Sequence, residues 1–174
     1  MSPTPQTSFR EDQIASGAFI AHNATVFGDV TIAEKTSVLF QAVIRGDCEQ
    51  IKLGRGCNVQ DHCILHADPG YPCILGDDVT LGHGAIVHGA TIENNVLVGM
   101  RAVIMNGACI GQGSLIAAGA VITEGIQIPP HSIVAGLPGK IRGQTTDKHQ
   151  RMIQHAATHY QSLIDSYKQA DLGN

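Results

Sequence analysis

An aliphatic side chain recurs every six residues along most of this chain, and this period constrains the fold more than any other feature. An amphipathic helix has a period near 3.6 residues and a half-buried strand a period of 2, so neither explains a period of six. Twenty positions follow the rhythm, with three offsets, which makes chance spacing a poor explanation. These positions are Ile14, Ile20, Val26, Ile32, Val38, Ile44, Leu53, Val59, Leu65, Leu75, Leu81, Val87, Ile92, Val98, Ile104, Ile110, Ile116, Ile122, Ile128 and Val134.

Hexapeptide periodicity is typical of a parallel β-helix. Each hexad forms a short strand and a turn, three hexads close one triangular coil, and the aliphatic residues stack about 4.8 Å apart. We predict an all-β solenoid of about seven triangular coils over residues 14–143, after a polar N-terminal extension at 1–13. The 20 glycines, the absence of Trp and the 4% aromatic content fit a narrow core of this kind.

The six-residue period stops before residue 144, and residues 144–174 are predicted to form a C-terminal α-helix and tail. The helix is expected over 147–168, with Asp147 as N-cap and Gln150 at N3. We expect it to cover one face of the solenoid or to contact a neighbouring subunit. Its predicted apolar stripe consists of Met152, Ile153, Ala156, Tyr160, Leu163, Ile164 and Tyr167.

Two of the breaks in the period are insertions. Three extra residues follow Ile44 and four follow Leu65. Counting hexads in threes places both insertions at the same corner of the prism, one coil apart. Insertions on one edge of a solenoid often mark its binding surface, so we expect the functional site at this corner.

The position of a residue within its hexad locates its side chain on the prism. His66 and His88 each follow an in-phase aliphatic residue three hexads apart, so they should stack on one face, roughly 5 Å from each other. Arg45 occupies the same position one coil below. His83 falls on the adjacent face, above Asp61, and should not reach an ion held by the first pair because the faces diverge by about 120°.

These columns suggest a metal site shared between copies of the chain. In a three-fold ring, each ion would take His66 and His88 from one chain and His83 from its neighbour. Three neutral imidazoles with an open fourth position form the arrangement of a catalytic zinc site. Ordinary solvated side chains are expected for His22, His62, His131, His149, His155 and His159.

Three motifs in order, "RGD" at 45–47, "NVQDHCILH" at 58–66 and "HGAIVHG" at 83–89, resemble the gamma-class carbonic anhydrases. The resemblance covers roughly residues 14–165. It implies a left-handed β-helix, a homotrimer with a zinc ion at each subunit interface, and reversible hydration of CO2 to bicarbonate by zinc-bound hydroxide. Fe2+ or Co2+ are alternative ions.

The resemblance also implies roles for individual residues. His66, His83 and His88 would be the metal ligands, and Gln60 would hydrogen-bond the metal-bound water or bicarbonate. Arg45 would pair with two carboxylates of the site, partly across the subunit interface. A tyrosine on the C-terminal helix would line the pocket. These further catalytic-site residues are Arg45, Asp47, Asp61 and Tyr160.

The chain departs from this family where other members carry proton-shuttling glutamates. Cys48 follows Asp47, and the second corner loop, "ADPGYPC", contains Asp68 as its sole acid. The resemblance is therefore to a shorter branch that lacks the acidic loop. Because proton export is a separate step from attack on CO2, weak turnover could accompany an intact metal site.

Composition excludes several other classes. A net charge of −4 offers no basic surface for nucleic acid. No run of 18 apolar residues suggests a membrane span, and the N-terminus has no apolar signal segment, so we expect a cytoplasmic protein without membrane partners. Five cysteines without CxxC spacing argue against a disulfide framework. Cys57 and Cys63 are expected in the core, whereas Cys48 and Cys73 are expected in the corner loops, where a redox pair is conceivable.

Two other functions compete with a carbonic anhydrase. A hexapeptide acyltransferase would use a histidine as base and bind coenzyme A, and its histidine needs no metal. A non-catalytic scaffold would use zinc only to hold a trimer together. The closing segment "AGLPGKIRG" resembles that of many acyltransferases, but it indicates fold and not chemistry.

Overall fold

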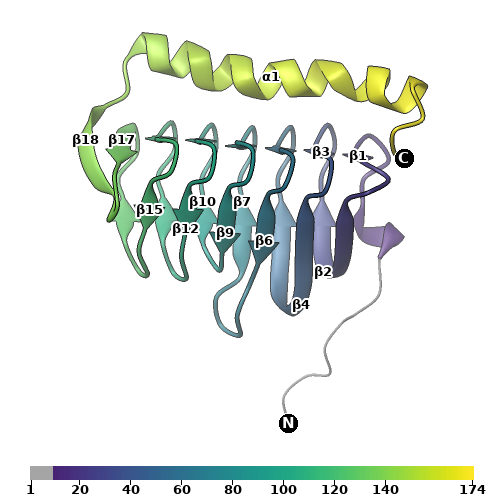
Figure 1. Cartoon of the computed structure of the whole chain (residues 1–174), viewed down its shortest axis with the longest axis horizontal. Helices are drawn as coiled ribbons and strands as arrows, with labels where there is room; N and C mark the ends of the chain where they lie inside the picture. Colours follow the sequence, from purple (N-terminus) through teal and green to yellow (C-terminus); the bar gives the residue numbers. More distant parts are fainter. Residues whose placement is uncertain (1–9) are drawn as a thin grey trace.

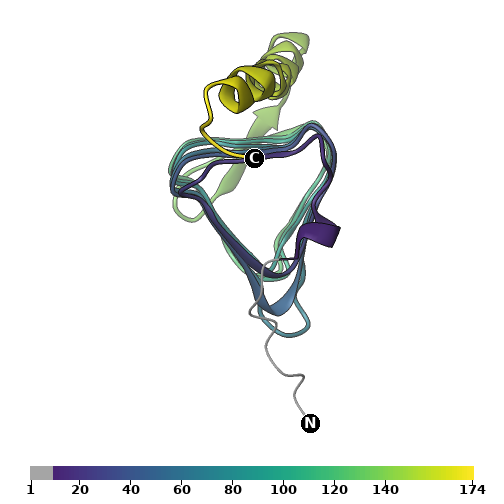
Figure 2. The ribbon, with the colours of Figure 1, turned by 90° about the vertical axis from the view of Figure 1, so that its right-hand side faces the viewer.

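The computed structural model describes residues 10–174, so residues 1–9 of the predicted N-terminal extension lie outside the described part. The chain winds into a triangular solenoid of short parallel strands with one long helix along its side (Figures 1 and 2). The prediction of a left-handed parallel β-helix followed by a C-terminal helix is confirmed. Residues Glu11–Gln13 form a single 3-10 turn, η1, before the first coil.

The strands build three faces, which we name by what lies on them. The helix-covered face contains β1 (Phe19–Ile20), β3 (Ser37–Val38), β5 (Asn58–Val59), β8 (Thr80–Leu81), β11 (Leu97–Val98), β14 (Leu115–Ile116) and β17 (Ser132–Ala135). The histidine face contains β6 (Ile64–His66), β9 (Ile86–His88), β12 (Val103–Ile104) and β15 (Val121–Ile122), and the third face contains β7 (Cys73–Leu75), β10 (Thr91–Ile92), β13 (Cys109–Ile110) and β16 (Gln127–Ile128).

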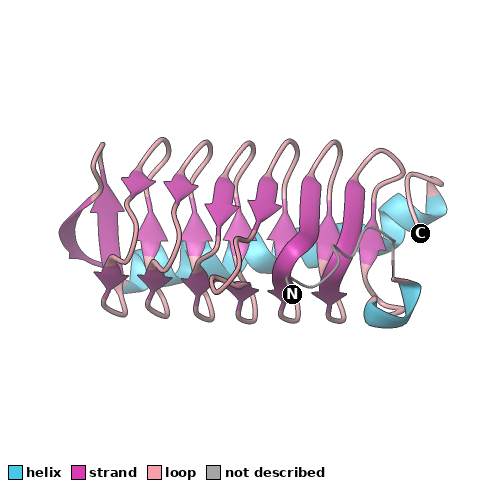
Figure 3. Ribbon diagram, turned by 90° about the horizontal axis from the view of Figure 1, so that it is seen from below, coloured by secondary structure: helices cyan, strands magenta, loops and turns pink. Residues whose placement is uncertain are grey.

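Two longer strands bend across the corner between the histidine face and the third face. These are β2 (Thr25–Ile32) and β4 (Val43–Leu53). The first part of β4 pairs with β6 and its last part pairs with β7, which joins the two faces into one sheet. Figure 3 shows the resulting ladder of coils, in which β2 and β4 are the two long strands.

The in-phase aliphatic residues form the core. Of the twenty, all but Ile14 lie in one continuous buried cluster, and Ile14 packs against its end. Each stacks on its counterpart in the next coil, as in the register Ile44 to Leu65 to Val87. Burial of aliphatic surface against both neighbouring coils therefore stabilises the solenoid, as the six-residue period predicted.

Small residues follow many of the core positions because adjacent coils approach closely there. At Gly99, an added Cβ would lie 2.5 Å from the backbone nitrogen of Ala118 in the next coil. A larger side chain at this position would therefore push two coils apart.

The C-terminal helix α1 (Asp147–Gln169) packs against β1, β3, β5 and β8 on the helix-covered face (Figure 1). The predicted N-cap was wrong by one residue. Thr146, with extended backbone, is the N-cap, and its backbone N–H donates to Nδ1 of His149 at N3. The prediction for Met152 was also wrong, because the helix is rotated so that Ala157 is buried and Met152 is exposed.

Both ends of the solenoid are covered. At one end, β18 (Lys140–Gln144) pairs antiparallel with β17. At the other end, the C-terminal tail returns to β1, where the side chain of Asn174 accepts a hydrogen bond from the backbone N–H of Ile20. These additions cover strand edges that would otherwise be free to pair with other chains. Within residues 10–174, no helix is both long enough and apolar enough to span a membrane.

Candidate metal centre

The two insertions project from one corner, between the histidine face and the third face (Figure 1). The first is the bend of β4, and the second is the loop between β6 and β7. A turn at Asp68–Tyr71 closes the second loop, with the N–H of Tyr71 donating to the carbonyl of Asp68 at 2.8 Å. Gly70 has a φ of +83° in this turn, and its N–H donates to Oε2 of Glu49 on the first insertion.

His66 and His88 stack beside this corner as the register predicts. His66 ends β6, His88 ends β9, and the two residues are paired across the sheet. Their ring centroids are 4.9 Å apart, and Nδ1 of His66 lies 2.9 Å from Nε2 of His88. Arg45 pairs with His66 one coil below, also as predicted.

The outer nitrogen of each ring is held by an oxygen that can only accept. Nε2 of His66 lies 3.2 Å from a carboxylate oxygen of Asp47. Nδ1 of His88 lies 2.7 Å from the amide oxygen of Asn106, whose own amide nitrogen donates to Asp68. Because an ionised carboxylate and an amide oxygen accept but do not donate, both outer ring nitrogens must carry hydrogens.

It follows that the inner nitrogens, Nδ1 of His66 and Nε2 of His88, carry no hydrogen when the rings are neutral. Each inner nitrogen then presents a lone pair to the other. Two lone pairs 2.9 Å apart repel each other unless a cation lies between them. The edge of a tetrahedron around zinc is about 3.3 Å when the Zn–N bonds are 2.0–2.1 Å. The donor set therefore fits a divalent metal ion bound by the inner nitrogens.

Asp47 is held in its charged form. Partial burial alone would raise the pKa of Asp47, but hydrogen bonds from Arg45 and His66 outweigh burial and lower it. One guanidinium nitrogen of Arg45 contacts both carboxylate oxygens at 2.8 Å. A carboxylate that stays ionised fixes the His66 tautomer, which leaves Nδ1 free to bind metal.

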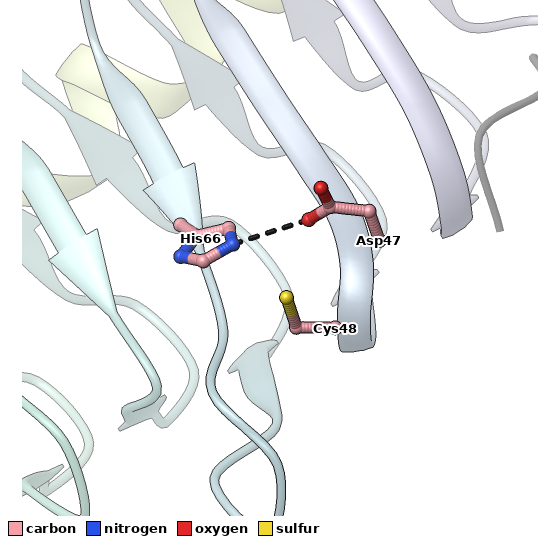
Figure 4. A group of neighbouring side chains, drawn as sticks. All are labelled: Asp47, Cys48 and His66. Atoms are coloured by element: carbon pink, nitrogen blue, oxygen red, sulfur yellow. Dashed lines mark hydrogen bonds and ion pairs between the residues drawn. The ribbon is translucent and has the colours of Figure 1, made fainter. Parts of the chain in front are cut away.

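Cys48 lies beside Asp47 and His66, as Figure 4 shows. Its sulfur, an Asp47 oxygen and a His66 nitrogen lie within 4.8 Å of one another. The predicted position of Cys73 in the corner loop was wrong, because Cys73 lies in β7 and is fully buried, whereas Cys48 is exposed. Cys57 and Cys63 are buried in the core as predicted.

His83 lies away from this pair, at the corner between the helix-covered face and the histidine face. Its Nδ1 lies 2.7 Å from a carboxylate oxygen of Asp61, as expected from their stacking. When the ring is neutral, Asp61 keeps the hydrogen on Nδ1, so Nε2 of His83 carries a lone pair. The His83 side chain is 48% exposed. Within the described residues, His83 belongs to no group of donors that includes His66 and His88.

Gln60 and Tyr160 also lie on the His83 side. The side-chain oxygen of Gln60 accepts from the backbone N–H of His83, and its nitrogen donates to Asn58. Tyr160, on α1, is half-buried against an apolar cluster under the helix. Burial, and then the nearby charge of Asp61, raise the pKa of Tyr160.

The candidate residues thus form two groups in one chain. Arg45, Asp47, His66 and His88 form one, and Gln60, Asp61, His83 and Tyr160 form the other. Arg45 and Asp61 lie in different groups, so their predicted pairing across the subunit interface stays a prediction. Sequence reasoning did not identify Asn106, because it lies two residues beyond Ile104, the last residue of β12 that the register pairs with β9.

Comparison with known proteins agrees with the fold and with the family resemblance. A family model described as Dynactin subunit 5 matches residues 8–168. The chain is 52% identical over 158 residues to the "Probable carbonic anhydrase" of Methanocaldococcus jannaschii, covering 89% of this chain and 99% of that protein. It is 33% identical over 156 residues to gamma carbonic anhydrase 1, mitochondrial, of Arabidopsis thaliana, covering 86% and 57%.

Among solved structures, an acetyltransferase candidate from Bacillus cereus superposes with a TM-score of 0.89 at 41% identity, covering 91% of this chain and 92% of that one. Fold and site together define a hexapeptide-repeat protein with a candidate metal-binding group of histidines. The chain belongs to the gamma-class carbonic anhydrase family.

Proposed function

We propose that this protein is a lyase that interconverts CO2 and bicarbonate at metal sites shared between the subunits of a homotrimer. The observation that supports this most directly is the state of the three histidines. Each of His66, His83 and His88 has one ring nitrogen held by an acceptor, which leaves the other nitrogen as a lone pair. Zinc is the metal that we propose, and when bound it supplies a water acidic enough to ionise near neutral pH.

A shared site is proposed because one chain separates the two groups of residues. Outward-facing residues of the histidine face form an apolar column beside His66 and His88. The column consists of Val43, Ile64, Ile86, Val103 and Val121. Ile64 is 42% exposed in the single chain, so a second copy that packs here would bury apolar surface and bring its His83 towards the metal.

The chain's own residues bind the metal ion, orient its ligands and orient the reacting water or bicarbonate. His66 and His88 bind the ion, and Asp47 and Asn106 keep their outer nitrogens protonated. Asp61 orients His83 in the same way. Gln60, beside His83, is proposed to orient the reacting water or bicarbonate. Hydration of CO2 by water releases one proton to solvent with each bicarbonate, and the absence of a glutamate at position 48 is expected to slow this step.

Subunit complementation tests the shared site. Trimers of His66→Ala chains and trimers of His83→Ala chains each lack a complete site. Mixing the two under subunit exchange should restore CO2 hydration, measured by stopped flow on metal-quantified protein, because a mixed interface combines an intact His66–His88 pair with an intact His83. Mixing His66→Ala with His88→Ala is the matched control and should restore nothing. No rescue in the first mixture would reject a shared site.

His88→Ala tests the chemistry itself and should lose both metal and CO2 hydration. Retained hydration in this variant would place the reaction elsewhere. An acyltransferase is the second candidate, favoured by the likeness to the Bacillus cereus acetyltransferase candidate. Calorimetry with coenzyme A separates the two, because binding of coenzyme A to metal-free protein would support the acyltransferase. A scaffold would keep its trimer when loaded with zinc but show no hydration.

A further inference from the structure

A single chain already offers three metal donors at the insertion corner. Ligand atoms of His66, Asp68 and His88 all lie within 4.8 Å of one another. Asp68 comes from the loop between β6 and β7, two residues after His66. Two imidazoles and one carboxylate are a recurring set for divalent iron and related ions.

Asp68 is held in place for this role. Its turn is closed by the backbone hydrogen bond from Tyr71, and the loop is tied to Glu49 through Gly70. One carboxylate oxygen, Oδ2, accepts from the amide of Asn106 at 3.0 Å. The other, Oδ1, makes no side-chain hydrogen bond among residues 10–174 and is available to a cation.

Charge also favours a carboxylate at this point. Two neutral imidazoles bring no negative charge to a divalent cation, and Arg45 is neutralised by Asp47. Asp68 contributes the compensating charge within the same chain. Hard carboxylate oxygen and borderline imidazole nitrogen together suit Zn2+, Fe2+ and Co2+.

We propose that Asp68 is the third ligand of the isolated protomer, so that one chain captures a divalent cation on His66, Asp68 and His88 before assembly. This inference builds on the proposed function, because a neighbouring His83 then replaces Asp68 when the trimer forms. Loading does not depend on the interface, and Asp68 Oδ1 leaves the ion once the third imidazole arrives, while Oδ2 keeps its hydrogen bond from Asn106.

Cobalt titration of metal-free, full-length protein tests this, with visible absorption as the readout. His83→Ala removes the ligand of the assembled site and should still bind one Co2+ per chain, including in monomers resolved by native mass spectrometry. Adding Asp68→Asn should weaken Co2+ binding about 100-fold and change the spectrum, because a ligand is lost. Adding Glu124→Gln, an acid on the coil above Asn106, is the control and should change neither.

Asn106→Leu in the His83→Ala background separates a ligand from a positioning residue. If Asp68 acted only by orienting Asn106, this variant would match the Asp68→Asn loss, which would overturn the proposal. We expect instead a smaller loss with an unchanged cobalt spectrum. Equal Co2+ affinity with and without Asp68 would also overturn it, and circular dichroism confirms that each variant is folded. Failure of the proposed function would appear separately, as absent CO2 hydration in the wild type, without altering the cobalt result.

Discussion

Nδ1 of His66 and Nε2 of His88 face each other at 2.9 Å, although 22 residues separate them in the chain. Both rings are turned this way by acceptors on their far sides, Asp47 for His66 and Asn106 for His88. The orientation of the pair therefore depends on residues that do not themselves bind the ion, which makes those residues testable.

Asn106→Leu should weaken metal binding by about 10-fold, because His88 loses the acceptor that keeps its Nδ1 protonated. Asn106→Asp keeps the acceptor oxygen for His88 but loses the amide that donates to Asp68, so it should weaken binding less than Asn106→Leu. Zinc affinity measured by competition with a chelator checks both. Equal weakening in the two variants would show that Asn106 acts by packing and not through this hydrogen bond.

Asp61→Ala should also weaken zinc binding about 10- to 100-fold, since it removes the acceptor at Nδ1 of His83. Asp61→Asn retains one acceptor oxygen and should fall between Asp61→Ala and the wild type. Native mass spectrometry reports the oligomeric state at the same time. Unchanged zinc affinity in Asp61→Ala would argue against His83 as a ligand.

Stability should depend on the inward side chain of each strand and not on its outward neighbour. Ile92→Ala, which truncates a fully buried residue of β10, should lower the free energy of unfolding by about 2–5 kcal/mol. Thr91→Ala changes an exposed position on the same strand and should cost less than about 0.5 kcal/mol. Urea denaturation at one fixed protein concentration compares the two, and similar losses would contradict the assigned register.

Three buried thiols predict a loss of stability at alkaline pH. Burial raises the pKa of Cys57, Cys63 and Cys73 to about 12, from an ordinary value of 9.0. Below pH 9 the thiols are protonated in the folded and unfolded chains alike. Between pH 9 and about 12 only the unfolded chain releases these protons, so the free energy of unfolding should fall as pH rises, by up to about 1.4 kcal/mol per pH unit for each thiol.

Cys73→Ala should make this alkaline slope shallower, because one of the three thiols no longer titrates. Val87→Ala, a core truncation without a titratable group, should lower stability at every pH and leave the slope unchanged. Thermal or urea unfolding across pH 8–11 measures both. An identical slope in the wild type and Cys73→Ala would mean that the Cys73 thiol does not contribute.

Much of this architecture could be predicted from the amino-acid sequence. In a β-helix, the sequence separation between two residues translates directly into a number of coils, so the stacking of Arg45, His66 and His88 and the pairing of His83 with Asp61 followed from counting hexads. The same counting located both insertions at one corner. Helix α1 was predicted in its extent, but its rotation was not, because only contact with the solenoid selects Ala157 over Met152 for burial.

What only the tertiary structure decided is how side chains reach across the corner. Asn106 contacts His88 diagonally, and Asp68 approaches both histidines from a turn outside the repeat, where the six-residue period no longer specifies position. Repetition determines the backbone because every coil repeats the same packing. The direction of a polar side chain at an irregular corner depends instead on hydrogen bonds that form only after the coils have stacked.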